Sequence, residues 1–167
     1  MVVPADELDV VAAMELARES KVPILPRGGG TSQCGQTVGE ALVIDDSKHL
    51  RKVTAFDAQA MTVEVQPGMV LDELNAWLKP HGLWYPVDVS TSAQATLGGM
   101  AGNNSCGSRS IAYGNMVHNV LGIDALLEQH LRNKRDVVLE SWVAPAPALA
   151  SFASPRVRVS VASGGRT

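Results

Sequence analysis

The 167-residue sequence has few cysteines, few aromatic side chains and no excess of positive charge. Its two cysteines, Cys34 and Cys106, are too few for a disulfide framework and lack the CxxC spacing of a zinc or redox site, so we expect mostly buried thiols. A net charge of −3 and a pI near 5.8 argue against a nucleic-acid partner. No segment is apolar for long enough to span a bilayer and residues 1–10 lack a signal peptide's pattern, which predicts a cytoplasmic protein.

What is present predicts one globular domain with an α+β fold, since 46% of the residues are hydrophobic and 19% are charged. Two segments have helical spacing, 5–19 and 70–79, and three have a strand pattern, 22–26, 41–45 and 61–66. The side chains expected to face the core from the first helix are Leu8, Val11, Ala12 and Leu16. Because the strands are close in sequence, we expect them to pair in part as hairpins.

A glycine triplet at residues 28–30, within ILPRGGGTSQCG, interrupts this pattern. Ordering three glycines is entropically costly, which indicates a sharp turn or the close approach of another group. The mononucleotide motif GxxxxGK[ST] nearly matches but has Gln36 in place of its lysine, and the dinucleotide motif GxGxxG has Gln33 in place of its last glycine. Both motifs open a helix, whereas a strand is predicted at 41–45, so both are excluded on context.

Two interpretations of the loop remain. The loop forms a nest of backbone N–H groups that holds a phosphate, with further hydroxyl donors from Thr31 and Ser32, or it is a glycine-rich turn without a ligand. A second cluster, TLGGMAGNNSCG at 96–107, favours the ligand, because it is uncharged and carries two asparagines. Amide side chains both donate and accept hydrogen bonds, as reading the edge of a heteroaromatic ring requires. The two clusters together predict a site for a large dinucleotide.

Three ordered stretches resemble the FAD-binding domain of the vanillyl-alcohol oxidase and p-cresol methylhydroxylase flavoprotein superfamily: VPILPRGGGTSQCG, VEVQPGMVLDELNAWL and HGLWYPVDVSTSAQATLGGMAGNNSCGSRSIAYGN. The branch of the glycolate oxidase D-subunit and D-lactate dehydrogenase is the most similar, and the resemblance covers about residues 4–127. It implies two α+β subdomains with FAD between them, the second incomplete here. The FAD-binding domain would occupy 1–127, followed by a divergent, poorly ordered tail at 128–167.

The resemblance also implies which residues bind FAD: the glycine loop wraps the pyrophosphate, and the later motifs lie along the flavin, close the pocket and pass the adenosine. In chain order they are Arg27, Gly28, Gly29, Gly30, Thr31, Ser32, Gly35, Pro86, Asp88, Thr91, Thr96, Gly98, Gly99, Asn103, Ser105, Gly107, Tyr113, Gly114 and Ile123. Members with covalent flavin carry histidine where Thr31 stands or cysteine where Gln94 stands, so noncovalent FAD is implied. Cys106 is then interpreted as a packing or pocket residue.

In the family, a hydride passes from a 2-hydroxy acid to the flavin, and the flavin carries out the redox chemistry. The base and the arginine for the substrate carboxylate come largely from a later substrate domain, so no catalytic residue and no metal ligand are assigned. His118, which follows the pocket segment, is the histidine that merits attention. The main hypothesis is the FAD-binding portion of an oxidoreductase acting on a D-2-hydroxy acid such as lactate or glycolate.

After Leu127 the resemblance stops, where relatives usually continue LLADG. Residues 1–127 hold eight basic and fourteen acidic side chains and residues 128–167 hold six and three, so the charge balance changes sign there. Residues 140–163 show no convincing period. We hypothesise a truncated form or an altered reading frame, which predicts that no homologous strand within 128–167 packs on the fold.

Two alternatives to the main hypothesis stay open. The first is a noncatalytic fragment that binds FAD weakly or not at all, whose exposed apolar surface would favour a partner chain that supplies the missing half. The second keeps the fold but changes the reaction to that of the cell-wall reductase relatives, which the NNSCG element at 103–107 argues against.

Overall fold

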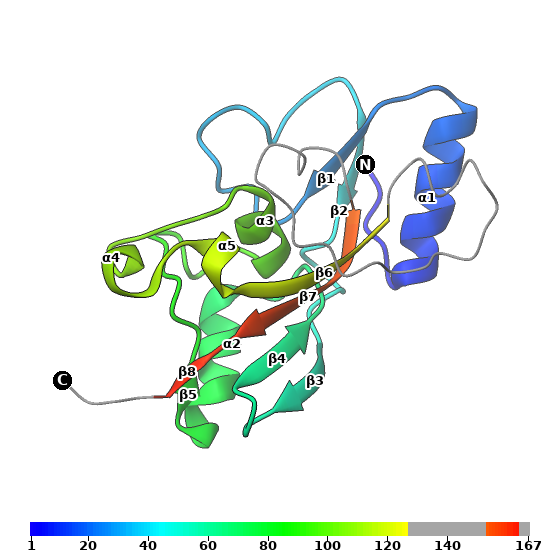
Figure 1. Cartoon of the computed structure of the whole chain (residues 1–167). Helices are drawn as coiled ribbons and strands as arrows, with labels where there is room; N and C mark the ends of the chain where they lie inside the picture. Colours follow the sequence, from blue (N-terminus) through cyan, green and yellow to red (C-terminus); the bar gives the residue numbers. More distant parts are fainter. Residues whose placement is uncertain (127–152, 164–167) are drawn as a thin grey trace.

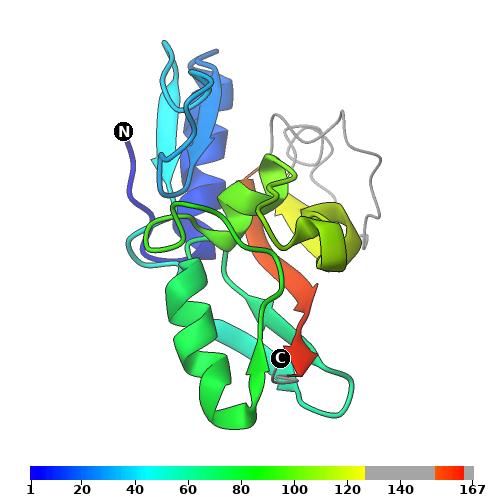
Figure 2. The same ribbon diagram turned by 90° about the vertical axis from the view of Figure 1, so that its left-hand side faces the viewer.

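The computed structural model describes residues 1–126 and 153–163, which form two lobes (Figure 1). The first lobe consists of α1 (Glu7–Glu19), β1 (Ile24–Arg27) and β2 (Leu42–Asp45). The second lobe consists of β3 (Val53–Asp57), β4 (Thr62–Val65), α2 (Leu71–Leu78), the 3-10 helix η1 (Lys79–His81), β5 (Leu83–Trp84), α3 (Leu97–Gly102), α4 (Ser110–Tyr113), α5 (Met116–Asn119), β6 (Val120–Leu126), β7 (Ala153–Ser160) and β8 (Ala162–Ser163). Figure 2 shows the lobes stacked, with α3 near their junction.

In the first lobe, β1 and β2 are parallel, with Ile24 opposite Leu42 and Arg27 opposite Asp45. The expectation of a hairpin is therefore wrong for this pair, because the loop between the strands carries the chain back to the starting edge. The predicted strand after the glycine loop is confirmed. Helix α1 covers the pair, and the shared core contains Val10, Ala13, Met14, Ile44, Leu50 and Leu126.

Helix α1 forms as predicted, and the Asp6 side chain caps it by accepting hydrogen bonds from two backbone amides of its first turn. The prediction of its buried face is wrong: Leu8 is 77% exposed and Leu16 is 59% exposed. The core instead receives the side chains of Val10, Ala13, Met14 and Ala17. Both sets have helical spacing, and the second set includes two alanines, which let the helix lie close to β2.

In the second lobe, a four-stranded sheet has the order β3, β4, β7, β6. Strands β3 and β4 are antiparallel neighbours along the chain, so the hairpin expectation is confirmed here, although β3 itself was not predicted. Val63 and Val65 are buried as predicted, whereas Met61 is 43% exposed and has a φ of 51° in the turn before β4.

Helix α2 confirms its prediction, because Leu71, Leu74 and Leu78 are all buried in the core of the second lobe. The turn of η1 follows it, and Gly82 ends this segment in the left-handed region with a φ of 71°. Within the described residues, no helix is long and apolar enough to cross a membrane.

Strands β7 and β8 were not predicted. β7 pairs antiparallel with β4 on one side and with β6 on the other, and β8 pairs with β5. Val157 and Val159 of β7 are fully buried. These strands contradict the expectation that no strand within 128–167 packs on the fold. The structural argument for an altered reading frame depended on that expectation and is therefore wrong as well. The rest of the expected tail, 127–152 and 164–167, lies outside the described residues.

Candidate functional site

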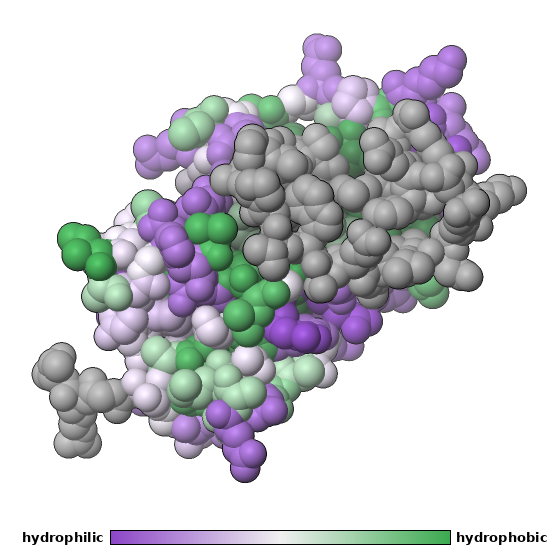
Figure 3. All heavy atoms as spheres, viewed as in Figure 1, coloured by the Kyte–Doolittle hydropathy of each residue, from purple (hydrophilic) through white to green (hydrophobic). Residues whose placement is uncertain are grey.

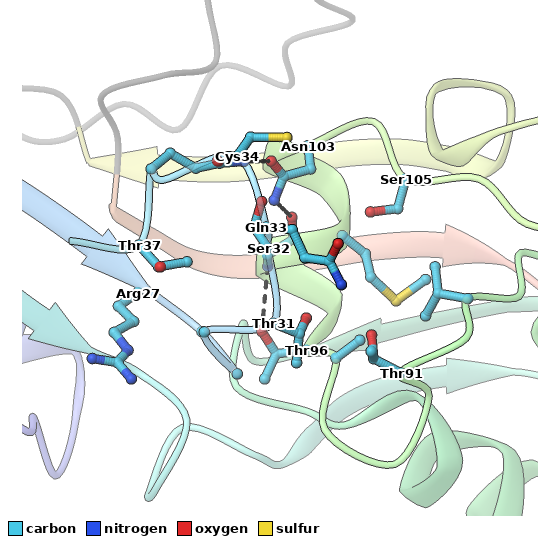
Figure 4. A pocket seen from close by; sticks show the side chains of 18 of the residues that line it. Arg27, Thr31, Ser32, Gln33, Cys34, Thr37, Thr91, Thr96, Asn103 and Ser105 are labelled. Carbon is cyan, nitrogen blue, oxygen red and sulfur yellow. Dashed lines mark hydrogen bonds between the residues drawn. The ribbon is translucent and has the colours of Figure 1, made fainter.

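A cleft of about 540 Å³ lies between the loop that follows β1 and the segment that leads into and out of α3 (Figure 4). Its first wall is formed by residues 26–34, 36 and 37, and its second wall by residues 89–91, 95, 96, 99, 100, 103, 105 and 106. The two glycine clusters recognised in the sequence therefore face each other. Since the first wall belongs to the first lobe and the second wall to the second lobe, the cleft depends on how the lobes are placed.

The glycine triplet is explained by close packing and by backbone conformation. A Cβ at Gly28 would overlap the Thr96 hydroxyl, and a Cβ at Gly29 would overlap the Gln94 carbonyl. Gly30 has a φ of +64°, and the Arg27 guanidinium lies 2.9 Å from where its Cβ would stand. Both sequence-based alternatives, a sharp turn and a close approach, are thus present, and the group that approaches is the second glycine segment.

A hydrogen bond of 2.7 Å from the Gln36 side chain to the Asn103 Oδ1 joins the two walls. Asn103 is fixed in turn, because its Nδ2 donates to the Gly99 carbonyl at 2.9 Å. The Thr96 hydroxyl caps α3 by accepting from the Gly99 amide. Gln36, which excluded a mononucleotide motif, thus connects the loop to α3.

The lining is polar and nearly uncharged. Hydroxyl groups come from both walls, including Thr31 and Ser32 on the first and Thr91 and Ser105 on the second. Arg27 is the one charged residue among the described lining residues. Its Nε is buried and has no hydrogen-bond partner in the described structure, and the nearest carboxylate oxygen of Asp45 is 4.0 Å away. A single cation in an otherwise uncharged lining favours an anionic ligand in the cleft.

Eleven of the nineteen residues implied to bind FAD line this cleft: Arg27, Gly28, Gly29, Gly30, Thr31, Ser32, Thr91, Thr96, Gly99, Asn103 and Ser105. The other eight lie outside the lining: Gly35, Pro86, Asp88, Gly98, Gly107, Tyr113, Gly114 and Ile123. Ile123 is buried in the core of the second lobe. The structure thus brings eleven of the implied residues together in one cleft, and their contact with FAD stays a prediction.

Asp88 supports the turn that precedes α4. It accepts hydrogen bonds from the Ser108 hydroxyl at 2.7 Å and from the Arg109 amide at 3.0 Å. Desolvation alone would raise the pKa of the Asp88 carboxyl, but these hydrogen bonds outweigh it and hold the pKa below its ordinary value. Gly107 is needed at this turn, since a Cβ there would overlap the Asp88 carbonyl.

Ten lining residues were not among the predicted set: Pro26, Gln33, Cys34, Gln36, Thr37, Val89, Ser90, Ala95, Met100 and Cys106. All are close in sequence to predicted residues, so proximity was the available signal. Cys34 and Cys106 are both exposed, which corrects the expectation of mostly buried thiols and agrees with a pocket position for Cys106. His118 lies outside the lining, and its Nδ1 accepts from the Asn115 amide at 3.1 Å in the cap of α5.

A two-lobed α+β domain with a glycine-walled, hydroxyl-lined cleft at the lobe junction defines a cofactor-binding class of protein. The profile of a family described as FAD binding domain matches residues 1–129, and the chain belongs to this family. FAD is the cofactor of the family.

Curated relatives with similar sequences are dehydrogenases and an oxidase subunit. The chain is 38% identical over 127 residues to D-2-hydroxyglutarate dehydrogenase of Pantoea ananatis, covering 74% of this chain and 12% of the relative. It is 31% identical over 128 residues to glycolate oxidase subunit GlcD of Bacillus subtilis, covering 76% of this chain and 27% of the relative. It is 35% identical over 128 residues to mitochondrial D-lactate dehydrogenase [cytochrome] of Arabidopsis thaliana, covering 76% and 22%. The chain thus spans a small part of each relative's length.

A solved structure of alkyldihydroxyacetonephosphate synthase has the same fold, with a TM-score of 0.80 and 23% sequence identity. The superposition covers 97% of this chain and 33% of that one. The sequence match to the family stops at residue 129, whereas the likeness in structure extends over nearly the whole chain. The expected two-subdomain FAD-binding fold is therefore confirmed.

Proposed function

We propose that this chain is the FAD-binding portion of a flavin-dependent oxidoreductase that oxidises a D-2-hydroxy acid, with the FAD pyrophosphate in the cleft. The observation that carries the proposal is Arg27, the one charged residue among the described lining residues, beside a glycine-lined wall. A phosphate oxygen would accept from Arg27, while Thr31 and Ser32 and the bare backbone around them supply further donors. No carboxylate among the described lining residues opposes an anion.

The size of the cleft suits one part of FAD. About 540 Å³ falls within the range of small-molecule sites. Bound FAD would supply the acceptor for the substrate hydride. The residues of this chain would position it, because Arg27, Thr31 and Ser32 supply donors for its phosphates.

FAD would be held without a covalent bond, since Thr31 and Gln94 stand where members with covalent flavin carry histidine or cysteine. Cys106 lines the second wall, and we interpret it as a pocket residue without a bond to the flavin. Acid precipitation of the FAD-loaded protein is therefore expected to leave all flavin absorption in the supernatant. Flavin that stays with the precipitated chain would show a covalent link.

The substrate class follows from the named activities of the relatives, D-2-hydroxyglutarate dehydrogenase, glycolate oxidase and D-lactate dehydrogenase, which all concern 2-hydroxy acids. A base and a carboxylate-binding cation would come from further polypeptide. Figure 3 shows apolar side chains over α4, α5 and β6, where Ile111 is fully exposed and Val117 and Leu121 are each 46% exposed. We assign this surface to the contact with that polypeptide.

The test is a titration of the purified chain with FAD, followed by flavin fluorescence and visible absorption. We expect saturable binding of one FAD per chain, and weaker binding when Arg27 is changed to Gln. A colourless protein that takes up no added FAD would contradict the proposal and favour the noncatalytic fragment. The substrate class is tested in the longer polypeptide that also supplies the base and the carboxylate-binding cation, by bleaching of the bound flavin with D-2-hydroxyglutarate, D-lactate or glycolate and with the L enantiomers of the chiral acids as controls.

A further inference from the structure

Strand β7 presents two arginines to the same face of the sheet, because Arg156 and Arg158 alternate with the buried Val157 and Val159. Arg156 reaches across to the first lobe: its Nε is 3.2 Å from Glu7 Oε1, and its Nη2 is 3.4 Å from Glu7 Oε2. Two nitrogens of one guanidinium thus meet both oxygens of one carboxylate, a geometry that fixes orientation.

Arg158 makes a related contact within the second lobe alone. Its Nη2 donates to Glu64 Oε2 at 2.9 Å, and this hydrogen bond is the main reason why the pKa of the Glu64 carboxyl is lowered. The Arg156 Nη1 also lies 3.8 Å from Glu64 Oε1, and Asp124 adds to the negative field around Arg156. The two arginines therefore share a strand, a face and an acidic neighbour, and differ in the contact to Glu7.

Glu7 is in the first turn of α1, and neither it nor Arg156 lines the cleft. The lobes meet at the cleft through the packing of Gly28 on Thr96 and through the Gln36 side chain. Leu126 of β6 also joins the lobes, because it packs in the core of the first lobe. The ion pair at α1 adds a directional contact to this apolar one, and such a contact restricts rotation of one lobe against the other. Since each lobe supplies one wall of the cleft, such a rotation would change the separation of the walls.

We propose that the ion pair between Glu7 and Arg156 is a latch that sets the separation of the cleft walls, which makes Arg156 a positioning residue for the cofactor. This inference rests on the proposed function as far as FAD is concerned. Arg156 lies outside residues 1–129, the part that matches the family, so the latch belongs to the C-terminal strand of this chain. The Arg156 side chain is 39% exposed and that of Glu7 is 35% exposed, so salt is expected to weaken the pair.

The first test compares FAD affinity in Arg156→Gln and Arg158→Gln. We expect Arg156→Gln to bind FAD about fivefold more weakly at low salt, the size of a modest coupling between sites. Arg158→Gln is the matched control and is expected to bind like the unaltered protein. At high salt the difference in FAD affinity between the two variants should shrink, because salt screens the pair between Glu7 and Arg156 in the protein that still has it.

The second test needs no FAD. Cys34 and Cys106 are the chain's two cysteines, both are exposed, and they lie on opposite walls of the cleft, so spin labels on them report the wall separation. We expect a broader distance distribution in Arg156→Gln than in Arg158→Gln. Equal distributions and equal FAD affinities in the two variants would overturn the latch, even if Arg156→Gln unfolded at lower urea. An unaltered protein that fails to bind FAD would contradict the proposed function, and the label distances would still decide the latch.

Discussion

The glycines of the loop after β1 are required for different reasons. Gly28 and Gly29 face backbone and side-chain atoms of the second lobe, whereas Gly30 needs its left-handed φ. The sequence predicts that something comes close here, because three glycines in a row are costly. It does not predict the partner, since Gln94 and Thr96 are far along the chain and meet the loop only in the folded structure.

Replacing Gly29 by Ala is expected to destabilise the fold by about 1–3 kcal/mol, because the added Cβ would overlap the Gln94 carbonyl and force the walls apart. FAD affinity should fall as well. Gly39→Ala, in the same loop, is the control: no heavy atom lies within 4 Å of its Cβ position. Urea unfolding and FAD titration measure both effects. Equal behaviour of the two variants would contradict the close contact between loop and second segment.

Asp46, directly after β2, is a carboxyl that sequence reasoning missed. It is 6% exposed, and its Oδ1 has no hydrogen-bond partner in the described structure. Burial, followed by repulsion from Asp45, raises the pKa of Asp46 from 3.8 to about 7. Between these two pH values the folded protein keeps a proton that the unfolded chain releases. Stability is therefore expected to fall as the pH rises through this range.

Asp46→Asn is expected to remove this loss, since an amide resembles the protonated acid and carries no charge. The gain at pH 8 should be at most about 4 kcal/mol, because three pKa units correspond to that free energy. At pH 4 the variant and the unaltered protein should differ little. Urea unfolding at pH 4, 6 and 8 measures the effect; a gain that is the same at all three values would contradict the assigned pKa.

Helix α1 illustrates what periodicity can and cannot decide. The spacing of apolar residues predicts the helix correctly, but the helix carries two apolar stripes and the sequence gives no reason to choose between them. Leu8 and Leu16 are more hydrophobic than Ala13, yet they are exposed, whereas Ala13 and Met14 are buried in the core. The choice is made by β2, against which a face with small side chains packs closely.

Met14→Lys and Leu16→Lys test this orientation as a matched pair. Met14 is 2% exposed, so a charge there is expected to destabilise the fold by several kcal/mol or prevent folding. Leu16→Lys should change the free energy of unfolding by less than about 0.5 kcal/mol, as surface substitutions do. Thermal unfolding followed by circular dichroism compares them. A larger loss from Leu16→Lys would mean that the originally predicted face is buried.

Helix α3 was missed for a different reason. Its sequence, LGGMAG, contains three glycines, which are poor helix formers, and no periodic signal survives in six residues. The helix forms because Thr96 caps it and because Leu97, Met100 and Ala101 are buried. Gly98 lets it approach Pro67, which a Cβ would meet at 2.7 Å. Tertiary packing overrides local propensity here, at the wall of the candidate site.

Across the whole molecule, the resemblance located both walls of the cleft and the two-lobed fold, but it misjudged where the fold ends. The family match stops at residue 129, and the composition of 140–163 gave no period. Inside that stretch, Val157, Val159 and Val161 alternate with polar residues and are all buried. An alternation this short does not predict a strand on its own. In the folded structure β7 forms because it fills the one place between β4 and β6 in the sheet.

If β7 is a central strand, the second lobe depends on it. Val159→Ala is expected to lower the free energy of unfolding by about 2 kcal/mol, because Val159 is fully buried opposite Val63 and its truncation leaves a cavity. Arg158→Ala, the exposed neighbour, should cost less than about 1 kcal/mol despite its ion pair with Glu64. Urea unfolding followed by the fluorescence of the tryptophans measures both. Equal, small effects would show that the sheet is stable without β7, and the fold would then end near residue 126, where the family match also stops.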